Sequence, residues 1–528
     1  MANPPPPYDN ITGISRAAMK DNAQESLANY NGNARPGELV VDQATTILYI
    51  GNALGQLTAV ATPGGATTWA LLSNKTGASG PTIIALGQNA GFDGQAAAAI
   101  AVGKNAGQGG QGASSITIGE DAGGNTTQGA NSVAIGRSAG FNAQGISSVA
   151  IGNSAGLTSQ GNQSVAIGDN AGVTQGSTAV AIGQNAGGGV ALQGDDAVAI
   201  GHGAGENTQG TQSVAIGLYT GQNTQGIQSV AVGKQAGQTT QGAYSVAVGD
   251  SAGTTTQGIQ SVAVGQRAGF SNQGQYSVAI GSYAGNSAQG ERTVAVGISA
   301  GMTSQGNNAI AIGNFAGNAT QGTYAIAIGS NAGAQGQGAN TVAIGTSAGN
   351  AQGIQSIAIG LQAGQTAQGP NNIAIGQQAG SNNQVGSSVA IGFQAGYNSQ
   401  DTQSVAIGIQ AGYSSQSLSA VAIGASTGAN TQGDSAVAVG RQAGQNSQGA
   451  FSVAVGRQAG QTSQANNSIV LNATGSALNQ TTANTFTVKP VRAVTSVTFA
   501  APTSGSIPAG FSPMYYNPTT GEIIVITT

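Results

Sequence analysis

The stretch "QGIQSVAVGKQAGQTTQGAYSVAVGDSAGTTTQG", residues 225–258, contains nearly the same phrase twice. The phrase recurs from about residue 81 to residue 464. Aligning its copies on the glycine that ends the Val-Ala-Ile-Gly phrase or a variant of it gives 24 of them, from Gly87 to Gly456. Successive glycines are sixteen positions apart at every step but four, and those four steps measure seventeen, fifteen, eighteen and fifteen. A short, strict period predicts a solenoid in which each repeat forms one coil.

The irregular steps show which part of each coil tolerates changes in length. All four lie between an Ala-Gly pair and the next glutamine, as in "AGGGVALQ" at residues 186–193. The distance from that glutamine to the first β-branched residue never changes. Segments that accept insertions are typical of surface loops. We therefore expect one tolerant loop per coil, between segments that are held in register with their neighbours.

The Ser-Val-Ala-Ile-Gly phrase alternates bulky and small residues, which predicts a β-strand with one bulky face and one nearly bare face. The glycine after it permits a corner with positive φ. We predict an all-β protein, a parallel β-solenoid or β-roll of about 24 coils with 16-residue repeats. The bulky residues are predicted to form a structural core ladder, represented by Val133, Ile135, Val149, Ile151, Val246, Val248, Val262 and Val264.

One glutamine per coil recurs in 24 copies, from Gln95 to Gln464. Identical amides stacked at the spacing of adjacent strands can form a hydrogen-bonded ladder along the axis. A row of glutamines serving as a binding surface is the alternative, and a structural ladder is favoured. The predicted structural amide ladder is represented by Gln144, Gln160, Gln225, Gln241, Gln257 and Gln273.

A coil this short, with two bulky side chains, has a thin core for the backbone that it must order. The Ala-rich face would allow another backbone to approach closely. We therefore predict a homotrimer in which the bare alanine faces meet near a threefold axis.

The sequence outside the repeats divides into three further segments. Residues 1–34 are Pro-rich at first and then carry a helical stripe after Ser15, and residues 35–80 predict a small β-meander and a cap containing Trp69. Residues 81–464 form the shaft. Residues 465–528 are predicted to form a β-rich tip that ends in a hairpin turning at 517–521, where Tyr515 and Tyr516 are candidates for receptor binding.

The stretch "NSVAIGRSAGFNAQGISSVAIGNSAG", residues 131–156, resembles the head repeats of trimeric autotransporter adhesins of the YadA type. The resemblance covers residues 81–464 and implies a left-handed parallel β-roll in a trimer. The period differs, because the repeat has a length of sixteen here and of fourteen in that family. A signal peptide, a coiled-coil stalk and a membrane anchor, which such adhesins carry, are not recognisable in this sequence.

The flanking segments resemble fibre proteins of tailed bacteriophages, particularly those of marine cyanobacteria. The stretches that carry this resemblance are residues 14–60, beginning "ISRAAMKDNAQ", and residues 467–492, "NSIVLNATGSALNQTTANTFTVKPVR". In many such fibres the second segment leads into a self-cleaving chaperone domain, which we do not expect within this sequence. The likeness implies a protein of the virion.

Composition argues against several other functions. The net charge is −4, the 13 basic residues are dispersed, and there is no cysteine, so nucleic-acid binding and thiolate metal sites are not expected. We predict no catalytic residues, no metal, no cofactor and no membrane insertion, and no signal peptide is visible. The single histidine, His202, is interpreted as a solvated corner residue. A row of threonines for ice binding is absent because the loop before glutamine varies.

The leading functional expectation is a trimeric virion fibre, on the tail, neck or capsid, that is extracellular when it functions. Its N-terminus would bind other virion structural proteins, the solenoid would be a stiff shaft, and the tip would contact a host surface glycan or protein. The alternatives are a bacterial cell-surface trimeric adhesin and a decoration or filament protein without receptor binding. Enzymatic activity is not expected.

Overall fold

The computed structural model describes residues 39–42, 47–51, 57–59, 84–189, 192–491 and 514–525. All secondary-structure elements in this part of the chain are β-strands, which confirms the predicted all-β class. None of it forms a helix long and apolar enough to cross a membrane. The helix predicted after Ser15 and the cap predicted around Trp69 lie outside the described residues. The chain divides into two units, residues 1–146 and 147–528.

The first unit contains an antiparallel sheet and the first solenoid turns. Strands β1 (Leu39–Asp42), β2 (Ile47–Gly51) and β3 (Leu57–Ala59) pair in the order β1-β2-β3, as the meander predicts. The turns carry one parallel strand per repeat, in register, so that like residues pair with like. These strands are β4 (Ile84–Leu86), β5 (Ile100–Val102), β6 (Ile116–Ile118) and β7 (Val133–Ile135).

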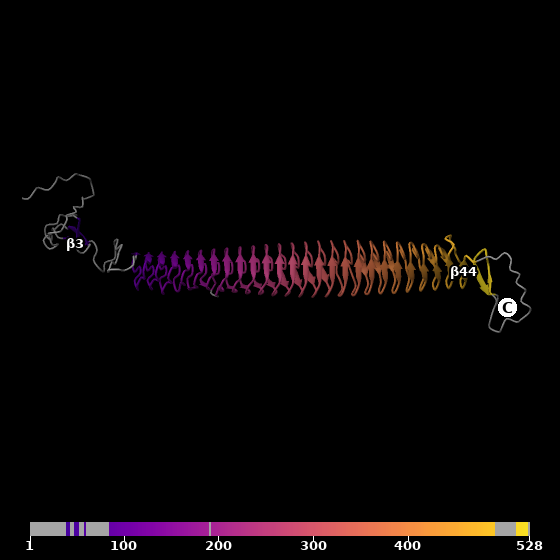
Figure 1. Ribbon diagram of the computed structural model, residues 1–528, viewed down its shortest axis with the longest axis horizontal. Coiled ribbons are helices and arrows are strands. Elements are labelled where there is room, and N and C mark those ends of the chain that lie inside the picture. The colour runs from indigo at the N-terminus through magenta and orange to yellow at the C-terminus, as the bar shows by residue number, and fades with distance from the viewer. Residues whose placement is uncertain are drawn as a thin grey trace, which may run out of the picture. The chain divides into compact units, whose positions relative to one another are not determined.

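The second unit has the same pattern, with a strand of three or four residues, called here the long strand, in each repeat. Figure 1 shows these strands stacked in a row. They are β8 (Val149–Ile151), β10 (Val165–Ile167), β12 (Val180–Ile182), β13 (Val198–Ile200), β15 (Val214–Ile216), β17 (Val230–Val232), β19 (Val246–Val248), β21 (Val262–Val264), β23 (Val278–Ile280), β25 (Val294–Val296), β27 (Ile310–Ile312), β29 (Ile326–Ile328), β30 (Val342–Ile344), β31 (Ile357–Ile359), β33 (Ile373–Ile375), β35 (Val389–Ile391), β37 (Val405–Ile407), β38 (Val421–Ile423), β39 (Val437–Val439), β41 (Val453–Val455) and β43 (Ile469–Asn472). The predicted parallel β-solenoid is confirmed, with about 25 turns that keep the spacing expected from the repeat.

Many turns also contain a second strand, of two or three residues, that ends at the repeated glutamine and is called here the short strand. These strands are β9 (Ser159–Gln160), β11 (Thr174–Gln175), β14 (Thr208–Gln209), β16 (Thr224–Gln225), β18 (Thr240–Gln241), β20 (Thr256–Gln257), β22 (Ser271–Gln273), β24 (Ser287–Gln289), β26 (Ser304–Gln305), β28 (Thr320–Gln321), β32 (Thr366–Gln368), β34 (Asn382–Gln384), β36 (Asn398–Gln400), β40 (Asn446–Gln448) and β42 (Thr462–Gln464). They pair in parallel, glutamine opposite glutamine, as between β16 and β18.

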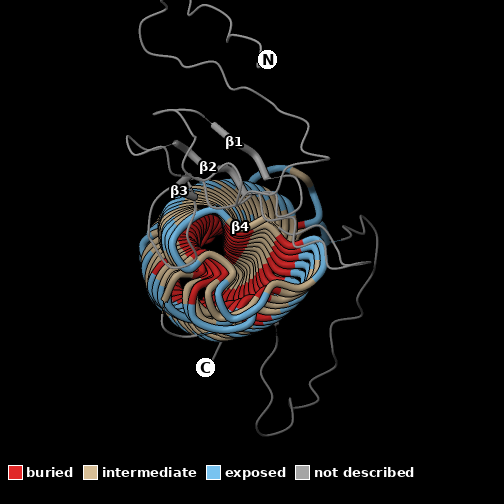
Figure 2. The backbone as a smooth tube through the Cα atoms, turned by 90° about the vertical axis from the view of Figure 1, so that its left-hand side faces the viewer, coloured by how far each residue is buried: buried red, intermediate tan, exposed pale blue. Residues whose placement is uncertain are grey.

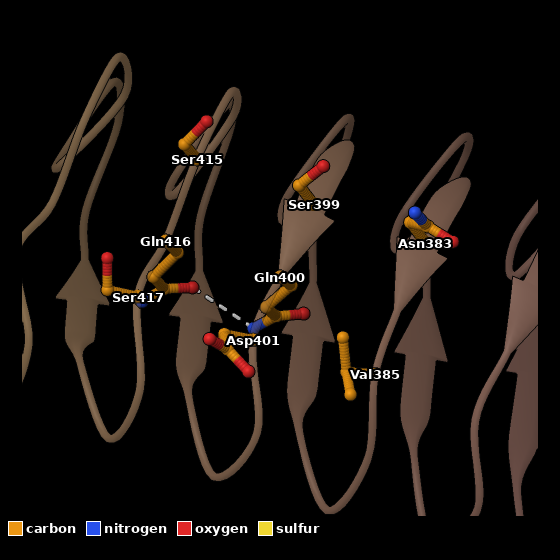
Figure 3. A pocket seen from close by; sticks show the side chains of 8 residues that line it. All are labelled: Asn383, Val385, Ser399, Gln400, Asp401, Ser415, Gln416 and Ser417. Carbon is orange, nitrogen blue, oxygen red and sulfur yellow. Dashed lines mark hydrogen bonds between the residues drawn. The ribbon is translucent and has the colours of Figure 1, made fainter.

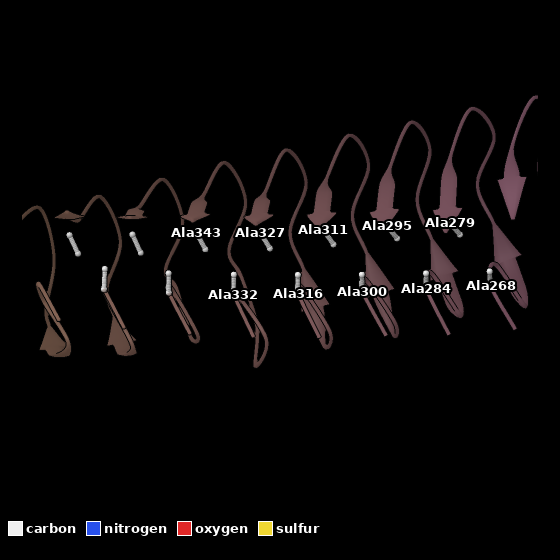
Figure 4. Close-up of a cluster of buried hydrophobic side chains, with 14 of the residues drawn as sticks. Ala268, Ala279, Ala284, Ala295, Ala300, Ala311, Ala316, Ala327, Ala332 and Ala343 are labelled. Carbon is white, nitrogen blue, oxygen red and sulfur yellow. The ribbon is translucent and has the colours of Figure 1, made fainter. Parts of the chain in front are cut away.

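The interior of each coil is filled by small side chains. The middle alanine of the long strand and the alanine of the Ala-Gly pair are fully buried, as at Ala263 and Ala268. Figure 4 shows these two alanine columns facing each other, and Figure 2 shows the buried residues lining the inside of the coil. The glutamine and the serine before the long strand complete the interior, with Gln257 and Ser261 at 2% and 0% exposed.

The assignment of the strand faces made from the sequence is therefore wrong. The alanine face points into the coil and is not a bare outer face. The bulky residues point outward and are only half-buried in the single chain, which applies to Val133, Ile135, Val149, Ile151, Val246, Val248, Val262 and Val264. The physical reason is width, because so short a coil has no room for two β-branched side chains beside the glutamine amide.

The corners depend on left-handed backbone at fixed positions. Gly249, after the long strand, has φ of +130°, and a Cβ there would lie 2.6 Å from the carbonyl oxygen of Gly265 in the next turn. Two further positions per turn have positive φ without requiring glycine, as at Tyr244 (59°) and Ser251 (58°). Glycine is thus essential where the next turn approaches closely, and polar or aromatic residues serve at the other corners.

The parallel stack continues beyond Asn472, which stands where the next corner glycine would be expected. Strand β43 pairs in parallel with one more strand, β44 (Phe486–Lys489), in which Phe486 lies beside Ile469. Strand β46 (Glu522–Val525) then pairs with β44 in the antiparallel direction and with β45 (Met514–Tyr516) in a hairpin. The predicted C-terminal hairpin is present, and it covers part of the edge of the last parallel strand.

Candidate functional site

The long strands carry a column of bulky residues on their outer face, which we call the outer ladder. It comprises the first and third residues of every long strand from β8 to β41. Successive turns align in register, so that Val246 lies beside Val262 and Val248 beside Val264. Exposure at the third position reaches 40% at Ile280. The ladder is a continuous apolar strip that a single chain leaves half uncovered.

This strip has the chemistry of a packing surface. β-Branched side chains carry no hydrogen-bonding or titratable group, so the strip offers shape and apolar area alone. Exposed apolar strips of this regularity are typical of protein–protein contacts.

The glutamine column lies inside the coil, and its six predicted members are 2–4% exposed. In each of these six turns the amide nitrogen donates to the carbonyl of the first long-strand residue, for example Gln144 to Val133 at 2.8 Å and Gln257 to Val246 at 2.7 Å. Gln160 and Gln273 make the same bond, to Val149 and Val262. The column thus joins the short and long strands of one coil.

A ladder from amide to amide exists only along part of this column. Gln128 donates to Gln144 at 2.7 Å, and an unbroken run of such bonds links Gln368 through Gln448 at 3.0–3.1 Å. At Gln225, Gln241, Gln257 and Gln273 the side-chain oxygen has no hydrogen-bond partner in the structure. The predicted ladder is therefore continuous in two runs, Gln95 to Gln144 and Gln368 to Gln448, and interrupted in the middle.

A second amide ladder was missed in the sequence. Gln410 donates to Gln394, Gln394 to Gln378, and Gln378 to Gln362, at 2.9–3.1 Å. These residues lie two positions after the corner glycine, with φ between 53° and 56°. The signal that could have revealed them is the unbroken run of glutamines at that position from residue 362 to residue 410.

The hairpin at the C-terminal end holds one described candidate for receptor contact. The Tyr516 hydroxyl donates to the Val488 carbonyl at 3.5 Å, so the half-buried ring is anchored against β44. The side chain of Tyr515 lies outside the described residues. The turn that follows is closed by Asn517, whose Oδ1 accepts from the backbone of Thr519 and Thr520. Receptor binding by either tyrosine stays a prediction.

The single histidine and two of the acidic residues of the solenoid make local contacts. His202 is exposed and lies 5.0 Å from the ring of Tyr219 in the next turn. Glu120 pairs with Lys104 at 3.1 Å, and Asp195 accepts from the Ser177 backbone at 2.8 Å. Within the described residues, no three histidine or acidic side chains are grouped so as to hold a metal ion.

A comparison with protein families finds one known repeat that matches these turns. The model of the YadA head domain repeat, which spans two copies, matches residues 143–171, 159–186, 193–220, 241–268, 288–316, 321–348 and 337–363. These stretches together cover less than half of the chain and lie wholly within the solenoid. No curated protein matches the chain. The solenoid is therefore similar to the head repeat of YadA, and such repeats suggest a trimeric, adhesin-type fibre.

Proposed function

We propose that this chain forms a rigid homotrimeric fibre of a tailed-phage virion, with the solenoid as its shaft and the C-terminal segment as its host-facing tip. The observation that supports a fibre is the stack of in-register turns, each of which adds one strand and two outward β-branched side chains. A stack of this kind extends by about 4.8 Å per turn and contains no long flexible linker among its described turns. Its composition and geometry point to a structural protein.

The trimer is proposed to form through the outer ladders. The alanine faces, which the sequence analysis placed at the threefold axis, are closed inside each coil. Each half-buried valine or isoleucine that a neighbouring chain covers contributes roughly 1 kcal/mol. Repeated over many turns, this contribution is enough to make three chains a more stable unit than one. The similarity to the YadA head repeat supports the same number of chains.

The N-terminal segment is proposed to bind other virion proteins, and the tip to bind a host glycan or protein. Support comes from the likeness of residues 14–60 and 467–492 to phage fibre proteins. Three copies of a weak site on one stiff arm raise the effective concentration of the second and third contacts. Adhesion would then follow from avidity without a tight single site.

A bacterial cell-surface adhesin is the second candidate, and the match to the YadA head repeat is equally consistent with it. Proteomic analysis of fractions from the organism that encodes the chain separates the two. The phage proposal expects the chain in purified virions, and the adhesin expects it in washed cell envelopes. Recovery from envelopes and not from virions would refute the phage proposal.

Sedimentation equilibrium of the full chain tests the trimer. We expect a mass of three times 50.9 kDa. A folded species of single-chain mass at micromolar concentration would refute the trimer and leave the solenoid intact.

Cell binding tests the tip. The full chain carrying Tyr515→Ala and Tyr516→Ala is expected to bind host cells at least tenfold more weakly than the unmodified chain. Phe451→Ala is a matched control because Phe451 is an aromatic residue of the solenoid that is 64% exposed. Equal loss in the control, or no loss in the double variant, would contradict a tip centred on these tyrosines.

A further inference from the structure

One face of the solenoid carries a groove that a change in the repeat creates. From Gln111 to Gln448 the residue after the column glutamine is glycine in every turn except three consecutive ones. These three turns have Val385, Asp401 and Ser417 instead. A hollow of about 360 Å³ lies at this place, lined by Asn383, Val385, Ser399, Gln400, Asp401, Ser415, Gln416 and Ser417.

The groove has a floor and two walls, as Figure 3 shows. Gln400 and Gln416, at 0% and 1% exposed, form the floor and are fixed by hydrogen bonds to each other and to the long strands. The residues before the glutamines form one wall: Asn383, Ser399 and Ser415. The residues after them form the other: Val385, Asp401 and Ser417. Turns with glycine at the latter position lack a side chain to build this second wall.

The substitution of glycine here required a local rearrangement. At regular turns a Cβ on this glycine would meet the next turn, as at Gly433, where it would lie 2.5 Å from the Ala450 nitrogen. Beside Val385 the buried side chain of Asn372 supplies new bonds: its nitrogen donates to the Gln384 carbonyl at 2.9 Å, and its oxygen accepts from the Ser388 backbone at 2.8 Å. Asparagine occurs in this position in no other repeat. The second wall is therefore a supported feature of the fold.

The groove lies away from the outer ladder. The amide nitrogens of Gln400 and Gln416 point inward and donate to Val389 and Val405 of the long strands at 2.8 and 2.7 Å. The walls precede and follow these inward-pointing side chains, and Asn383, Ser399 and Asp401 are exposed to solvent. A trimer that buries the long-strand faces thus leaves this opposite side of the coil accessible.

The lining indicates the class of ligand. Two hydroxyls and an amide on one wall face a carboxylate, a hydroxyl and an apolar side chain on the other, and no basic residue is among the eight. A carboxylate and hydroxyls bind ligand hydroxyl groups, whereas an anion would find no cation to pair with. The volume lies within the range of small-ligand sites, roughly 300–1,000 Å³. Three successive turns place the polar groups along about 10 Å of the axis.

We propose that this groove, the Val385 groove, binds a neutral carbohydrate, a di- or trisaccharide segment lying along the solenoid axis. Asp401 and the serines hydrogen-bond its hydroxyl groups, and Val385 packs against a C–H face of the sugar. The site is separate from the C-terminal tip, so it stands whether or not the tip binds a receptor.

The test is binding of the full chain to immobilised neutral and N-acetylated di- to tetrasaccharides, with sulfated and sialylated saccharides alongside. The variant V385G/D401G/S417G restores the regular glycine column and removes one wall, and its fold is checked by circular dichroism. We expect at least a tenfold loss of binding to neutral saccharides in this variant and a loss of about fivefold in Asp401→Asn.

Two controls complete the experiment. Ser447→Ala changes the equivalent of Ser399 at a turn that has glycine, Gly449, after its glutamine, and it is expected to leave binding unchanged. The loss caused by the glycine-restored variant is expected to be the same whether or not the chain also carries Tyr515→Ala and Tyr516→Ala, which separates this site from the proposed tip. Absence of binding to any neutral saccharide, a preference for anionic ones, or equal binding by the glycine-restored variant would overturn the proposal. A loss in N383A/S399A/S415A that matches the loss in the glycine-restored variant supports it.

Discussion

The two faces of one long strand differ in what they require of a side chain. On the inner face of β21, Ala263 is fully buried and has fully buried alanines above and below it. On the outer face, Val262 and Val264 of the same strand are only half-buried. The inner face demands small volume because the coil is narrow, and the outer face carries bulk that the single chain does not use. The larger apolar side chains are thus left available for contacts beyond the coil, such as those of the proposed trimer.

The largest effect is expected when a side chain on the inner face is replaced by a bulkier one. Ala263→Leu is expected to destabilise the solenoid by about 3 kcal/mol, because a buried site without free volume must distort its neighbours. Urea-induced unfolding followed by circular dichroism measures the change. Val264→Leu, on the outer face of the same strand, is expected to cost less than about 1 kcal/mol. A larger cost for Val264→Leu would show that the faces are assigned incorrectly.

The glutamine column differs between two regions of the solenoid, one with hydrogen bonds from amide to amide and one without them. Gln400→Leu is expected to cost about 2 kcal/mol, because it removes bonds to Gln384 and Gln416 as well as to the Val389 carbonyl. Gln257→Leu removes only the bond to Val246 and is expected to cost about 1 kcal/mol. Hydrogen exchange at the turns that contain each residue measures the local effect. Equal costs would indicate that the amide ladder contributes nothing beyond the strand contact.

The outer face is tested by replacing valine with threonine, which adds a polar group and keeps the shape of the side chain. The variant V246T/V248T/V262T/V264T is expected to raise the concentration for dissociation of the trimer at least tenfold, equivalent to about 1.4 kcal/mol. Sedimentation at several concentrations measures it. Because these residues are half-exposed in one chain, the circular dichroism of the folded chain should not change. A loss of fold at unchanged association would place the outer ladder in the core after all.

The smallest effect is expected at the second amide ladder. Gln378→Asn shortens the side chain that links Gln362 and Gln394 and keeps a residue that tolerates positive φ. We expect a change within about 0.5 kcal/mol in urea unfolding, since these amides are accessible to water. A cost equal to that of Gln400→Leu would mean that the outer amides matter as much as the buried ones.

The repeat predicted the architecture because each constraint appears many times in one chain. The Val-Ala-Ile alternation fixed the strand, and the corner glycine marked a place such as Gly249 where the next turn approaches closely. The fixed glutamine indicated a structural column. Alternation alone does not say which face is inside, and the usual preference for buried valine pointed to the wrong one. The deciding quantity was the width of the coil.

Other features could not be derived from residue types. The left-handed corners at Tyr244 and Ser251 carry no glycine, so their conformation had no marker. The groove was visible as three exceptions at Val385, Asp401 and Ser417, but its walls depend on the position of the side chains around the glutamine. Receptor binding by Tyr515 and Tyr516 stays a prediction, since only Tyr516 has a described contact.

The antiparallel strand β46 has a consequence for how copies of this protein can meet end to end. A parallel stack exposes at its last strand the same row of backbone groups that joined all earlier strands, and a further chain could add there as one more turn. Strand β46 occupies that row at Phe486 and Thr487 and runs in the opposite direction. Another chain arriving at this edge would find a mismatched template, so end-to-end addition there is disfavoured.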